Sequence, residues 1–484
     1  MVRSSLLTLL LAGLMTVAVA CGDDSSPSST TTTNGGDDAD VGLDGGDVGV
    51  EDVAEVGVDV DAAGADVEGD AVGPSCVEGT IGGAWERSVG LEVPLSGQAI
   101  VRGSLRTRIE ALDEGPDLVI EEDALATMID TGTQITSYDA DLLGGSAAFF
   151  RAEEVELGTV RLCDAVVKGR VITALEGAIG APVDVLLGQS MLMALDTTID
   201  YQGGRAWLLA EVPETAPPGM EGVTPFVLVA PFQNQFAVAS VGFGVALTGA
   251  LVEGGRACPP PGCCTAEGCP LMMDTGSEAT VITESLFAQL EAAHGAALPR
   301  LTGYRWVTNL GEDAAFVTRL PMVSLGGAEV SGEWAVVVPD AYHVRTVLEA
   351  EGIFIEGFVG APHLRHFMTG FRGPDTTFRF WPYATPSRFD GEWQRVGLEV
   401  TEREGGVVVD MVFAPSDAAT QGVAPGDRIV SVDGVPTGGL RGDAVRAALR
   451  GVPGQTRALV LSREGEAEPL ALDVLVEDLL PPLD

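Results

Sequence analysis

Short hydrophobic runs separated by glycine-rich turns fill the chain between about residues 80 and 386. Runs of this length, bounded by turn residues, are typical of β-strands. The clearest examples lie at 89–93, 99–101, 155–160, 238–247 and 333–338. Helical spacing is rarer, and apolar residues three and four positions apart indicate a helix at 284–293. The pattern therefore predicts a mostly-β fold for this part of the chain.

The same order of elements occurs twice along this region. Each copy contains an apolar run, an Asp-Thr-Gly tripeptide, a β region, an apolar-apolar-Gly triplet, a short helix and a closing strand. The landmarks are Asp130, Gly188 and a strand at 198–209 in the first copy, and Asp274, Gly360 and a strand at 376–383 in the second. The closing segments Thr-Thr-Ile-Asp-Tyr (197–201) and Thr-Thr-Phe-Arg-Phe (376–380) also resemble each other. Duplication of this size predicts two related lobes that face one another, at 79–213 and 214–388.

The paired tripeptides supply the candidate chemistry. Apolar residues before each aspartate predict a buried strand that holds the loop, and glycine permits a turn tight enough for two loops to meet. The threonine hydroxyl can bridge to the opposite loop, and the Ser or Thr that follows can bond the outer carboxylate oxygen. The residues concerned are Asp130, Thr131, Gly132 and Thr133 in the first loop and Asp274, Thr275, Gly276 and Ser277 in the second.

Two carboxylates brought this close share one proton, because ionising both is unfavourable. One is then a base that activates a water molecule, and the other is an acid that protonates the scissile amide. Such a pair, with Asp130 and Asp274 as its members, hydrolyses peptides without a metal, a cofactor or a covalent intermediate. A lone Asp-Thr-Gly would indicate only a turn in a chain rich in glycine and aspartate, whereas two copies with similar flanks favour a catalytic pair.

These features together resemble the retropepsin-like and pepsin-like aspartic peptidases over about residues 85–385. The resemblance implies a duplicated pair of β-barrel lobes, and the compact first lobe is closer to retropepsins. It also implies that Gly188 and Gly360 pack beside the catalytic loops.

Members of that superfamily carry a β-hairpin flap over the site. The stretch 303–311, with Tyr304 and Trp306, is the candidate flap, and an ordinary surface hairpin is the alternative. The equivalent stretch near 144–146 is short and lacks an aromatic tip. We therefore expect incomplete exclusion of water, and weak or restricted activity.

A third unit follows at 392–478. It combines β-like runs at 396–400, 407–412, 458–463 and 470–476 with short helices at 416–421 and 443–449. The run Ala-Pro-Gly-Asp-Arg-Ile-Val-Ser-Val-Asp-Gly is its most specific part, and the unit resembles an α+β bacterial PDZ domain over its whole length. Aspartic-peptidase lobes followed by a PDZ domain also resemble a known bacterial architecture.

The PDZ resemblance implies a groove in which an extended ligand adds to the edge of the sheet. The residues that would receive a peptide C-terminus are Gly397, Leu398, Glu399 and Val400. The helix at 443–449 would form the other wall of the groove. A packing module with an unused groove is the alternative.

The N-terminus has the features of an export signal. Arg3 precedes an apolar stretch at 6–19, which is too short to span a bilayer comfortably. The small residues before Cys21 resemble a bacterial lipobox, which implies a signal peptide at 1–20 and a lipid on Cys21. A plain secretory signal with a chance cysteine is the alternative, because a lipobox usually has Leu where this chain has Ala18. We expect a lipid-anchored protein of the bacterial cell envelope, either periplasmic or surface-exposed.

Charge and composition narrow the function further. The segment 21–78 is rich in Ser, Thr, Gly, Val and Asp, and we predict that it is a disordered acidic tether. The whole chain has 27 basic and 71 acidic residues, a formal net charge of −44. Such a chain repels phosphates, so nucleic acid is not an expected partner.

Six of the seven cysteines follow Cys21, and in an exported chain disulfides are expected. Four of them lie at 258–269, which predicts a disulfide-pinned loop. Zinc is the alternative there, but no Cys-x-x-Cys pair is present, and we expect no metal. Cys76 and Cys163 are candidates to pair across the first lobe.

These observations predict an envelope-anchored aspartic endopeptidase that acts on protein or peptide substrates, with a PDZ domain that docks substrate or partner C-termini. Both aspartates lie in one chain, so a homodimer is not required and we expect a monomer. One alternative is a catalytically weak or inactive peptidase-like lipoprotein that binds polypeptides. Another is a peptidase with one narrow regulatory substrate. The four histidines have no partner nucleophile, so we expect surface or packing roles for them.

Overall fold

The computed structural model describes residues 74–483 apart from gaps at 80–84, 86–87, 94–97, 112–117, 146–147, 158–159, 173–175, 177–180, 212, 214, 234–235, 246, 248–251, 254–255, 258–263, 265–267, 309–310, 386–390 and 404. The predicted signal peptide, lipidation at Cys21 and nearly all of the acidic tether lie outside the described residues, as do Cys258 and Cys263. Within the described part, no helix is long and apolar enough to cross a membrane.

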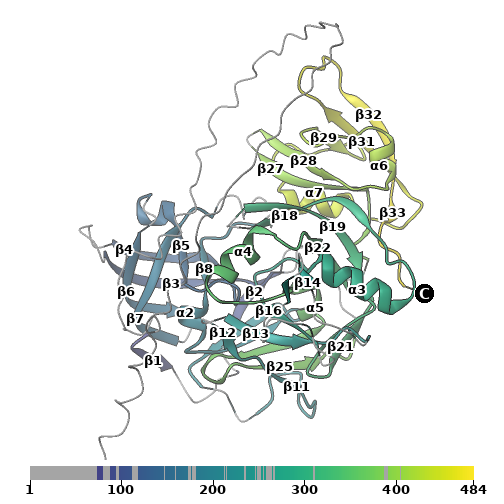
Figure 1. The fold of residues 1–484 in the computed structure, drawn as a ribbon. Coiled ribbons are helices and arrows are strands. Elements are labelled where there is room, and N and C mark those ends of the chain that lie inside the picture. The colour runs from purple at the N-terminus through teal and green to yellow at the C-terminus, as the bar shows by residue number, and fades with distance from the viewer. Residues whose placement is uncertain are drawn as a thin grey trace, which may run out of the picture. The chain divides into compact units, whose positions relative to one another are not determined.

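The first part of the described chain, here called lobe 1, extends from β1 to β10 and is almost entirely β. Its elements are β1 (Cys76–Gly79), β2 (Val89–Glu92), β3 (Ile100–Ala111), β4 (Leu118–Ile129), β5 (Ser137–Asp139), η2 (Ala140–Leu143), β6 (Phe149–Leu157), β7 (Val160–Arg170), β8 (Val185–Leu187), α2 (Gln189–Leu192), β9 (Asp196–Asp200) and β10 (Arg205–Leu209). The long strands β3, β4, β6 and β7 form the blue sheet of Figure 1, in which β3 pairs with both β4 and β6.

The second part, here called lobe 2, extends from β11 to β25. Its elements are β11 (Phe226–Val229), β12 (Phe232–Gln233), β13 (Phe236–Val241), β14 (Val252–Glu253), β15 (Arg256–Ala257), β16 (Cys269–Met273), β17 (Thr280–Thr283), α3 (Glu284–His294), β18 (Leu301–Thr308), β19 (Gly311–Arg319), β20 (Met322–Leu325), β21 (Ala328–Ser331), β22 (Trp334–Val338), α4 (His343–Ala350), β23 (Gly357–Val359), α5 (Ala361–Leu364), β24 (Phe367–Arg372), η3 (Gly373–Asp375) and β25 (Thr377–Pro382). The predicted helix is confirmed as α3. The Thr283 hydroxyl accepts a hydrogen bond from the Leu286 amide at its start, and Gly295 adopts a left-handed conformation at its end.

The last part, here called the C-terminal domain, extends from β26 to β33. Its elements are β26 (Gln394–Arg395), β27 (Leu398–Arg403), β28 (Gly406–Val412), α6 (Asp417–Thr420), β29 (Arg428–Val432), β30 (Val435–Pro436), α7 (Gly442–Ala448), β31 (Thr456–Ser462), β32 (Leu470–Leu475) and β33 (Glu477–Asp478). Its main sheet has the order β27-β28-β29-β31-β32, so that β27 is an edge strand. The chain is thus mostly β with a mixed C-terminal domain, and the predicted fold class is confirmed.

The two lobes repeat one arrangement of strands around their Asp-Thr-Gly loops. In lobe 1, β8 lies between β4, which is parallel to it, and β5, which is antiparallel, and β5 pairs in parallel with β7. In lobe 2, β23 has the same relation to β16 and β17, and β17 pairs in parallel with β22. The apolar residues before each aspartate and those of each triplet are therefore neighbouring buried strands, which explains why both runs are apolar throughout.

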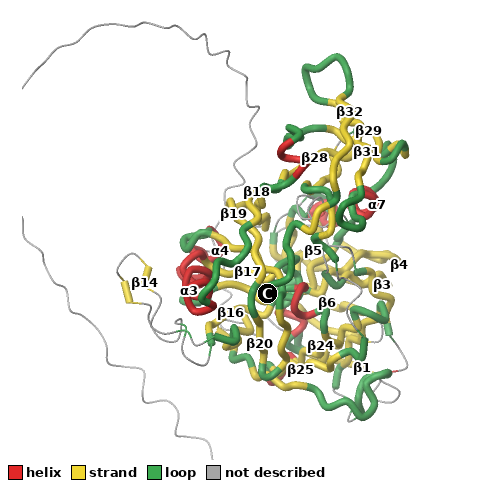
Figure 2. Tube along the Cα trace, turned by 90° about the vertical axis from the view of Figure 1, so that its right-hand side faces the viewer, coloured by secondary structure: helices red, strands yellow, loops and turns green. Residues whose placement is uncertain are grey.

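The closing strands of the two lobes join in one sheet. Its order includes β2-β10-β9-β24-β25-β11, and β9 pairs antiparallel with β24. Figure 2 shows β24 and β25 side by side. The segment 197–201 falls mainly in β9, directly after α2, whereas 376–380 falls mainly in β25, the second strand after α5. The sequence analysis matched these two segments as closing strands of the two copies, and this match is wrong. By order in the chain, the counterpart of β9 is β24, and the counterpart of β25 is β10.

The glycine of each triplet lies against the backbone of the Asp-Thr-Gly loop of its own lobe. A Cβ atom built on Gly188 would lie 2.7 Å from the Thr133 carbonyl oxygen, and one on Gly360 would lie 2.1 Å from the Ala279 carbonyl oxygen. Neither glycine has a positive φ, so space alone excludes a side chain. These contacts are the packing that the peptidase resemblance implies for the two glycines.

Hydrophobic cores cross the boundaries between the three parts. The largest buried cluster contains Leu208 of lobe 1 together with Phe371 and Phe378 of lobe 2. A second cluster contains Trp306 of lobe 2 together with Phe413 of the C-terminal domain. Because a buried aromatic side chain contributes about 1.5–3 kcal/mol through the hydrophobic effect, these clusters stabilise the described parts against separation.

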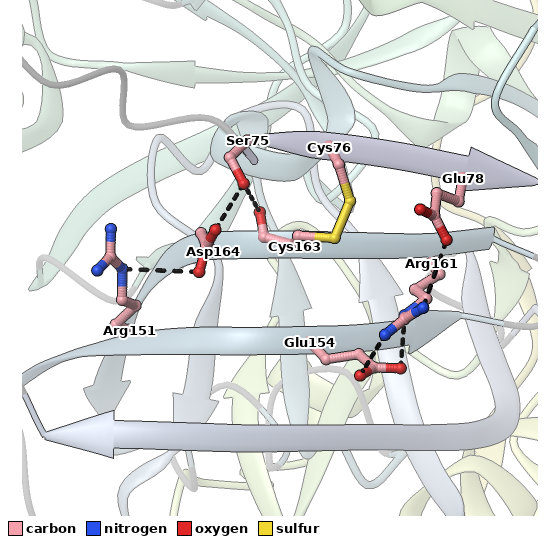
Figure 3. The surroundings of a disulfide bond; sticks show 8 residues. All are labelled: Ser75, Cys76, Glu78, Arg151, Glu154, Arg161, Cys163 and Asp164. Atoms are coloured by element: carbon pink, nitrogen blue, oxygen red, sulfur yellow. Dashed lines mark hydrogen bonds and ion pairs between the residues drawn. A yellow bond between two sulfur atoms is a disulfide. The ribbon is translucent and has the colours of Figure 1, made fainter.

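Two disulfides are present among the described cysteines. Cys76 on β1 is bonded to Cys163 on β7, which settles the pairing that the sequence left open, and the Ser75 hydroxyl donates a hydrogen bond to Asp164 beside it (Figure 3). Cys264 is bonded to Cys269 at the start of β16. The expectation of a disulfide-pinned loop at 258–269 is confirmed for this pair.

Replacing Gly360 with alanine is expected to destabilise the protein by about 1–3 kcal/mol, because the methyl group collides with rigid backbone rather than with a movable side chain. Urea denaturation followed by tryptophan fluorescence measures the change. Gly90→Ala is the matched control, since a methyl group added there would meet no atom within 4 Å beyond its chain neighbours. Equal unfolding free energies for the two variants would contradict the proposed packing role.

Candidate active site

The two Asp-Thr-Gly loops follow equivalent strands. Asp130 comes directly after β4, and its amide donates a hydrogen bond to the Leu187 carbonyl at 3.1 Å. Asp274 comes directly after β16, and its amide donates to the Val359 carbonyl at 3.0 Å. The carbonyl of the second apolar residue in each triplet thus fixes the backbone of the aspartate.

The loops are joined to each other by their threonines. The Thr131 amide donates to the Thr275 hydroxyl at 3.1 Å, and the Thr275 amide donates to the Thr131 hydroxyl at 3.0 Å. Each hydroxyl then donates at 2.7 Å across the lobe boundary, from Thr131 to the Met273 carbonyl and from Thr275 to the Ile129 carbonyl. Both threonines are 1% exposed, so water does not compete for these four bonds.

The glycine of each loop makes room for the carboxylate of the other. A Cβ atom on Gly132 would lie 2.4 Å from Oδ2 of Asp274, and one on Gly276 would lie 2.6 Å from Oδ1 of Asp130. The two carboxyl groups are themselves within hydrogen-bond distance of each other. The structure therefore brings Asp130 and Asp274 together as one pair.

The two carboxyl groups have different partners. Oδ2 of Asp130 accepts a hydrogen bond from the Thr133 hydroxyl at 2.6 Å, and its Oδ1 accepts one from the Gly132 amide at 2.9 Å. A hydrogen bond with Asp274 and the guanidinium of Arg170 also stabilise negative charge there.

The carboxyl group of Asp274 is bonded by backbone amides instead. Its Oδ1 accepts hydrogen bonds from the amides of Gly276 at 2.9 Å and Ser277 at 3.0 Å. The Ser277 hydroxyl donates to the Ala279 carbonyl at 2.7 Å. The bond from hydroxyl to outer carboxylate oxygen that the sequence suggested for both loops is thus made in the first loop and not in the second.

The two aspartates consequently differ in acidity. Burial raises the pKa of Asp130, while Thr133, Gly132 and Arg170 oppose the rise. Burial raises the pKa of Asp274 well above its usual value, and the negative charge of Asp130 raises it further. Asp130 is therefore the member that ionises first, and Asp274 is the member that keeps the shared proton.

Sequence reasoning missed two residues of this site. Gln189 follows Gly188 directly, and its side-chain amide donates to the Thr131 carbonyl at 2.7 Å. Arg170 ends β7, is partly buried, and acts on the charge of Asp130. The position of Gln189 after the triplet was a usable signal, whereas Arg170 becomes a neighbour of Asp130 only through the parallel pairing of β5 with β7.

The candidate flap is a β-hairpin of β18 and β19 whose tip, 309–310, lies outside the described residues. Tyr304 is 7% and Trp306 is 3% exposed. Trp306 packs against Phe358, with ring centroids 5.4 Å apart, while Tyr304 stacks on Phe413 of the C-terminal domain at 6.3 Å. Both side chains therefore contribute to packing in the described structure.

Tyr304 also forms a hydrogen bond next to the second Asp-Thr-Gly loop. Its hydroxyl donates to Oε1 of Glu278 at 2.6 Å. Burial raises the pKa of Glu278 to about 7. Glu278 follows Ser277 directly, so this bond connects the hairpin to the loop that carries Asp274.

The histidines have packing or ion-pair surroundings. His363 is fully buried, and burial lowers its pKa to about 3, so it stays neutral. His366 lies 2.8 Å from Glu333, and His343 contacts Asp313. In the described part of the chain, no three His, Cys, Asp or Glu side chains gather as a metal ion would require.

The candidate peptide-binding residues lie at the start of β27. Leu398 and Val400 are fully buried in the core of the C-terminal domain, and a Cβ atom on Gly397 would lie 2.3 Å from the Ser416 hydroxyl. The side chain of Glu399 instead faces Arg446 on α7. The backbone of this segment, rather than its apolar side chains, borders the groove between β27 and α7.

Comparison with known proteins bears mainly on this last domain. The family model described as PDZ domain matches residues 415–463, so the chain contains a PDZ domain there. No curated protein matches the sequence. Among solved structures, the crystal structure of basic 7S globulin from soybean is similar with a TM-score of 0.33 and 10% identity, over 61% of this chain and 94% of that chain. The interpretation of the two lobes therefore rests on the geometry of their loops.

Replacing Thr133 with valine is expected to raise the pKa of Asp130 by about one unit, because a hydrogen bond to a charged group contributes about 1.5–3 kcal/mol and part of it is regained from water. Carbon NMR titration of labelled aspartate carboxyl groups measures the change. Ser277→Ala is the matched control, since that hydroxyl bonds Ala279 rather than Asp274. A shift of the same size in both variants would show that the asymmetry does not arise from Thr133.

Proposed function

We propose that this chain is an aspartic endopeptidase that hydrolyses peptide bonds of polypeptide substrates. The observation that carries the proposal is the contact between the carboxyl groups of Asp130 and Asp274, held by reciprocal bonds between Thr131 and Thr275. Two adjacent carboxyl groups that share a proton provide a base and an acid at one point. A structural role alone does not require two acids to face each other.

The different acidities support an assignment of roles. The Asp130 carboxylate accepts a proton from a water molecule as the water oxygen attacks the amide carbonyl carbon. Asp274 donates its proton to the carbonyl oxygen, which gives a neutral tetrahedral intermediate. The proton held by Asp130 then passes to the amide nitrogen while the carbon–nitrogen bond breaks, and the hydroxyl returns its proton to Asp274. The products are a carboxylic acid and an amine, and both aspartates regain their initial states.

The PDZ domain supports a docking role for the C-terminal domain. An extended polypeptide would add to the edge of β27, with α7 as the opposite wall. We propose that this domain recruits substrates or partner proteins to the peptidase lobes. We further propose that the chain is anchored in the bacterial envelope by lipid on Cys21, which the sequence alone supports.

The direct test compares the wild-type chain with Asp130→Asn and Asp274→Asn on a reduced, denatured protein substrate. Each variant should lose activity by at least about 100-fold, because each removes one partner in proton transfer. Fluorescence release from a labelled substrate measures the rate, and a statine-containing peptide should block the wild type. Asp375→Asn is the control, since that carboxylate lies at the surface beside Arg372. Equal cleavage by all four chains would eliminate the peptidase and leave the polypeptide-binding alternative.

The pH dependence of kcat/KM should be bell-shaped. Activity is lost at low pH as Asp130 takes up a proton and at high pH as Asp274 releases its own, and the raised pKa of Asp274 puts the alkaline limb well above 3.8. Because that pKa is higher in the folded state than in the unfolded state, stability present at low pH is lost as pH rises through it. Asp274→Asn should therefore lose less stability than wild type between acid and neutral pH, which thermal unfolding at several pH values checks. Identical pH dependence of stability would contradict the acidity assigned to Asp274.

A further inference from the structure

A small cavity lies where lobe 2 meets the C-terminal domain, and its walls are densely charged. Its volume is about 60 Å³, which holds a few water molecules. Four acids line it: Glu278 of lobe 2, Glu392 in the segment that joins the two parts, and Glu399 and Asp410 of the C-terminal domain. Because so little water fits inside, each of these carboxylates needs a partner from the protein if it is to be ionised.

Arginines are the partners of the two acids in the C-terminal domain. Asp410 on β28 forms an ion pair with Arg305 on β18 at 2.7 Å. Glu399 on β27 forms ion pairs with Arg446 on α7 at 2.6 Å and with Arg395 on β26 at 2.8 Å. The guanidinium groups on this side of the cavity are therefore already bonded to carboxylates.

Glu392 is held in the same way. Its Oε2 accepts hydrogen bonds from Arg365 Nη2 at 2.5 Å and from Trp334 Nε1 at 2.9 Å. Its Oε1 lies 3.9 Å from the guanidinium group of Arg450. Three of the four acids therefore have cationic partners, which favour the ionised form of each carboxyl group.

Glu278 is the exception among the acids of this cavity. Within the described part of the chain, no basic side chain lies at ion-pair distance from it, and its carboxyl group accepts one hydrogen bond, from the Tyr304 hydroxyl at 2.6 Å. An ionised Glu278 would also face the negative charges of Glu399 and Glu392. The neutral carboxyl group fits this position better, because burial disfavours the charged form.

Glu278 also lies at the contact between lobe 2 and the C-terminal domain. Its partner Tyr304 stacks on Phe413, with ring centroids 6.3 Å apart. Two residues before Tyr304, the backbones of Thr302 and Ala414 exchange hydrogen bonds at 2.8 and 3.0 Å. A charge that appears on Glu278 therefore acts directly on the side chains and backbone that join β18 to the C-terminal domain.

We propose that Glu278 makes the contact between lobe 2 and the C-terminal domain sensitive to pH. The contact is closed while the Glu278 carboxyl group is neutral, and it loosens when that group loses its proton. The ionised carboxylate can be fully hydrated only if the cavity widens, and the wall opposite Glu278 belongs to the C-terminal domain. This conformational change goes beyond the function proposed above and does not depend on hydrolysis.

The acidity of Glu278 puts this change near neutral pH. Burial raises the pKa of Glu278 from 4.5 to about 7, while the Tyr304 hydroxyl and Arg446 lower it and the charges of Glu399 and Glu392 raise it. Because this pKa is higher in the closed state than in an open or unfolded one, the stability that the neutral group contributes is fully present below about pH 4.5. That stability is lost as the pH rises through about 7.

The test is amide hydrogen exchange of the full-length chain, measured by mass spectrometry at about pH 5 and about pH 8. Each rate is divided by the intrinsic exchange rate at the same pH, so that only protection is compared. Peptides that contain the amides of Thr302 and Ala414 should lose protection by about tenfold or more at the higher pH, since one unit of pKa difference between the closed and open states changes the opening equilibrium tenfold. Glu278→Gln, which keeps the shape of the side chain and cannot ionise, should have equal protection at both pH values.

Tyr304→Phe checks the direction of the effect. This variant keeps the aromatic ring against Phe413 and removes the hydrogen bond that stabilises the ionised carboxylate, so the loss of protection should move to higher pH. Glu329→Gln is the matched control, because that side chain is exposed on β21 and its replacement should leave the wild-type pH dependence unchanged.

Should Glu278→Gln not fold, Glu278→Met provides an uncharged side chain of similar length for the same comparison. The proposal is overturned if wild-type protection at Thr302 and Ala414 is equal at both pH values, or if Glu278→Gln retains the loss. It is also overturned if α3 loses protection to the same extent, since the change would then be general unfolding. Asp274→Asn removes the proposed hydrolysis and should keep the loss, so failure of the peptidase and failure of this proposal are distinguishable. Loss of the pH dependence in Asp274→Asn would assign it to the catalytic pair and overturn the role of Glu278.

Discussion

The reciprocal bonding of two threonines across the lobe boundary is the interaction on which the rest of this structure depends. Two acidic side chains repel one another when ionised and lose hydration when buried, so nothing in their own chemistry brings them together. Thr131 and Thr275 hold the two loops together. Each hydroxyl accepts a hydrogen bond from the amide of the other threonine and donates one to a carbonyl of the opposite lobe. The four bonds lie in a dry environment, where breaking one would leave a buried polar group unsatisfied.

The duplication makes the two halves of the site nearly symmetric, and small departures from symmetry make the two aspartates differ in acidity. The main-chain bonds around Gly188 recur around Gly360. The amide of each glycine also donates to a threonine hydroxyl, that of Thr136 in lobe 1 and that of Thr280 in lobe 2. The side-chain surroundings do not recur, because Thr133 bonds Asp130 while Ser277 turns to Ala279. The Thr133 hydroxyl and the charge of Arg170 act on Asp130 alone, and both lower the pKa of that acid. Identical tripeptides thus give chemically different side chains.

Much of this architecture could be predicted from the sequence, because the signals are local. The apolar runs, the helix that Thr283 caps and the PDZ-like turn sequence all depend on residues near one another. The paired tripeptides also identified the aspartates that the structure brings together. The contact between Asp130 and Asp274 is long-range, but the repeated sequence pattern around each aspartate allowed it to be predicted.

The features that could not be predicted depend on packing between distant segments. Nothing near Tyr304 or Trp306 in the sequence indicates that one stacks on Phe413 and the other on Phe358. The expected ligand-contacting role of Glu399 was likewise read without its partner Arg446, which lies on another element. The likeness of the segments at 197–201 and 376–380 misled the strand alignment, since β-strands of similar composition recur in a sheet of this kind. Pairwise side-chain contacts of this type have no periodicity from which they can be inferred.

The hydrophobic cluster that contains both Trp306 and Phe413 has a thermodynamic consequence. Side chains that share one core are expected to unfold together. The C-terminal domain and lobe 2 should therefore unfold as a single cooperative unit rather than independently. Any molecule that binds the native C-terminal domain then shifts the unfolding equilibrium of lobe 2 by the same free energy, through mass action alone. A ligand on the C-terminal domain would therefore lower the unfolded population of lobe 2, without any change in the native structure around Asp274.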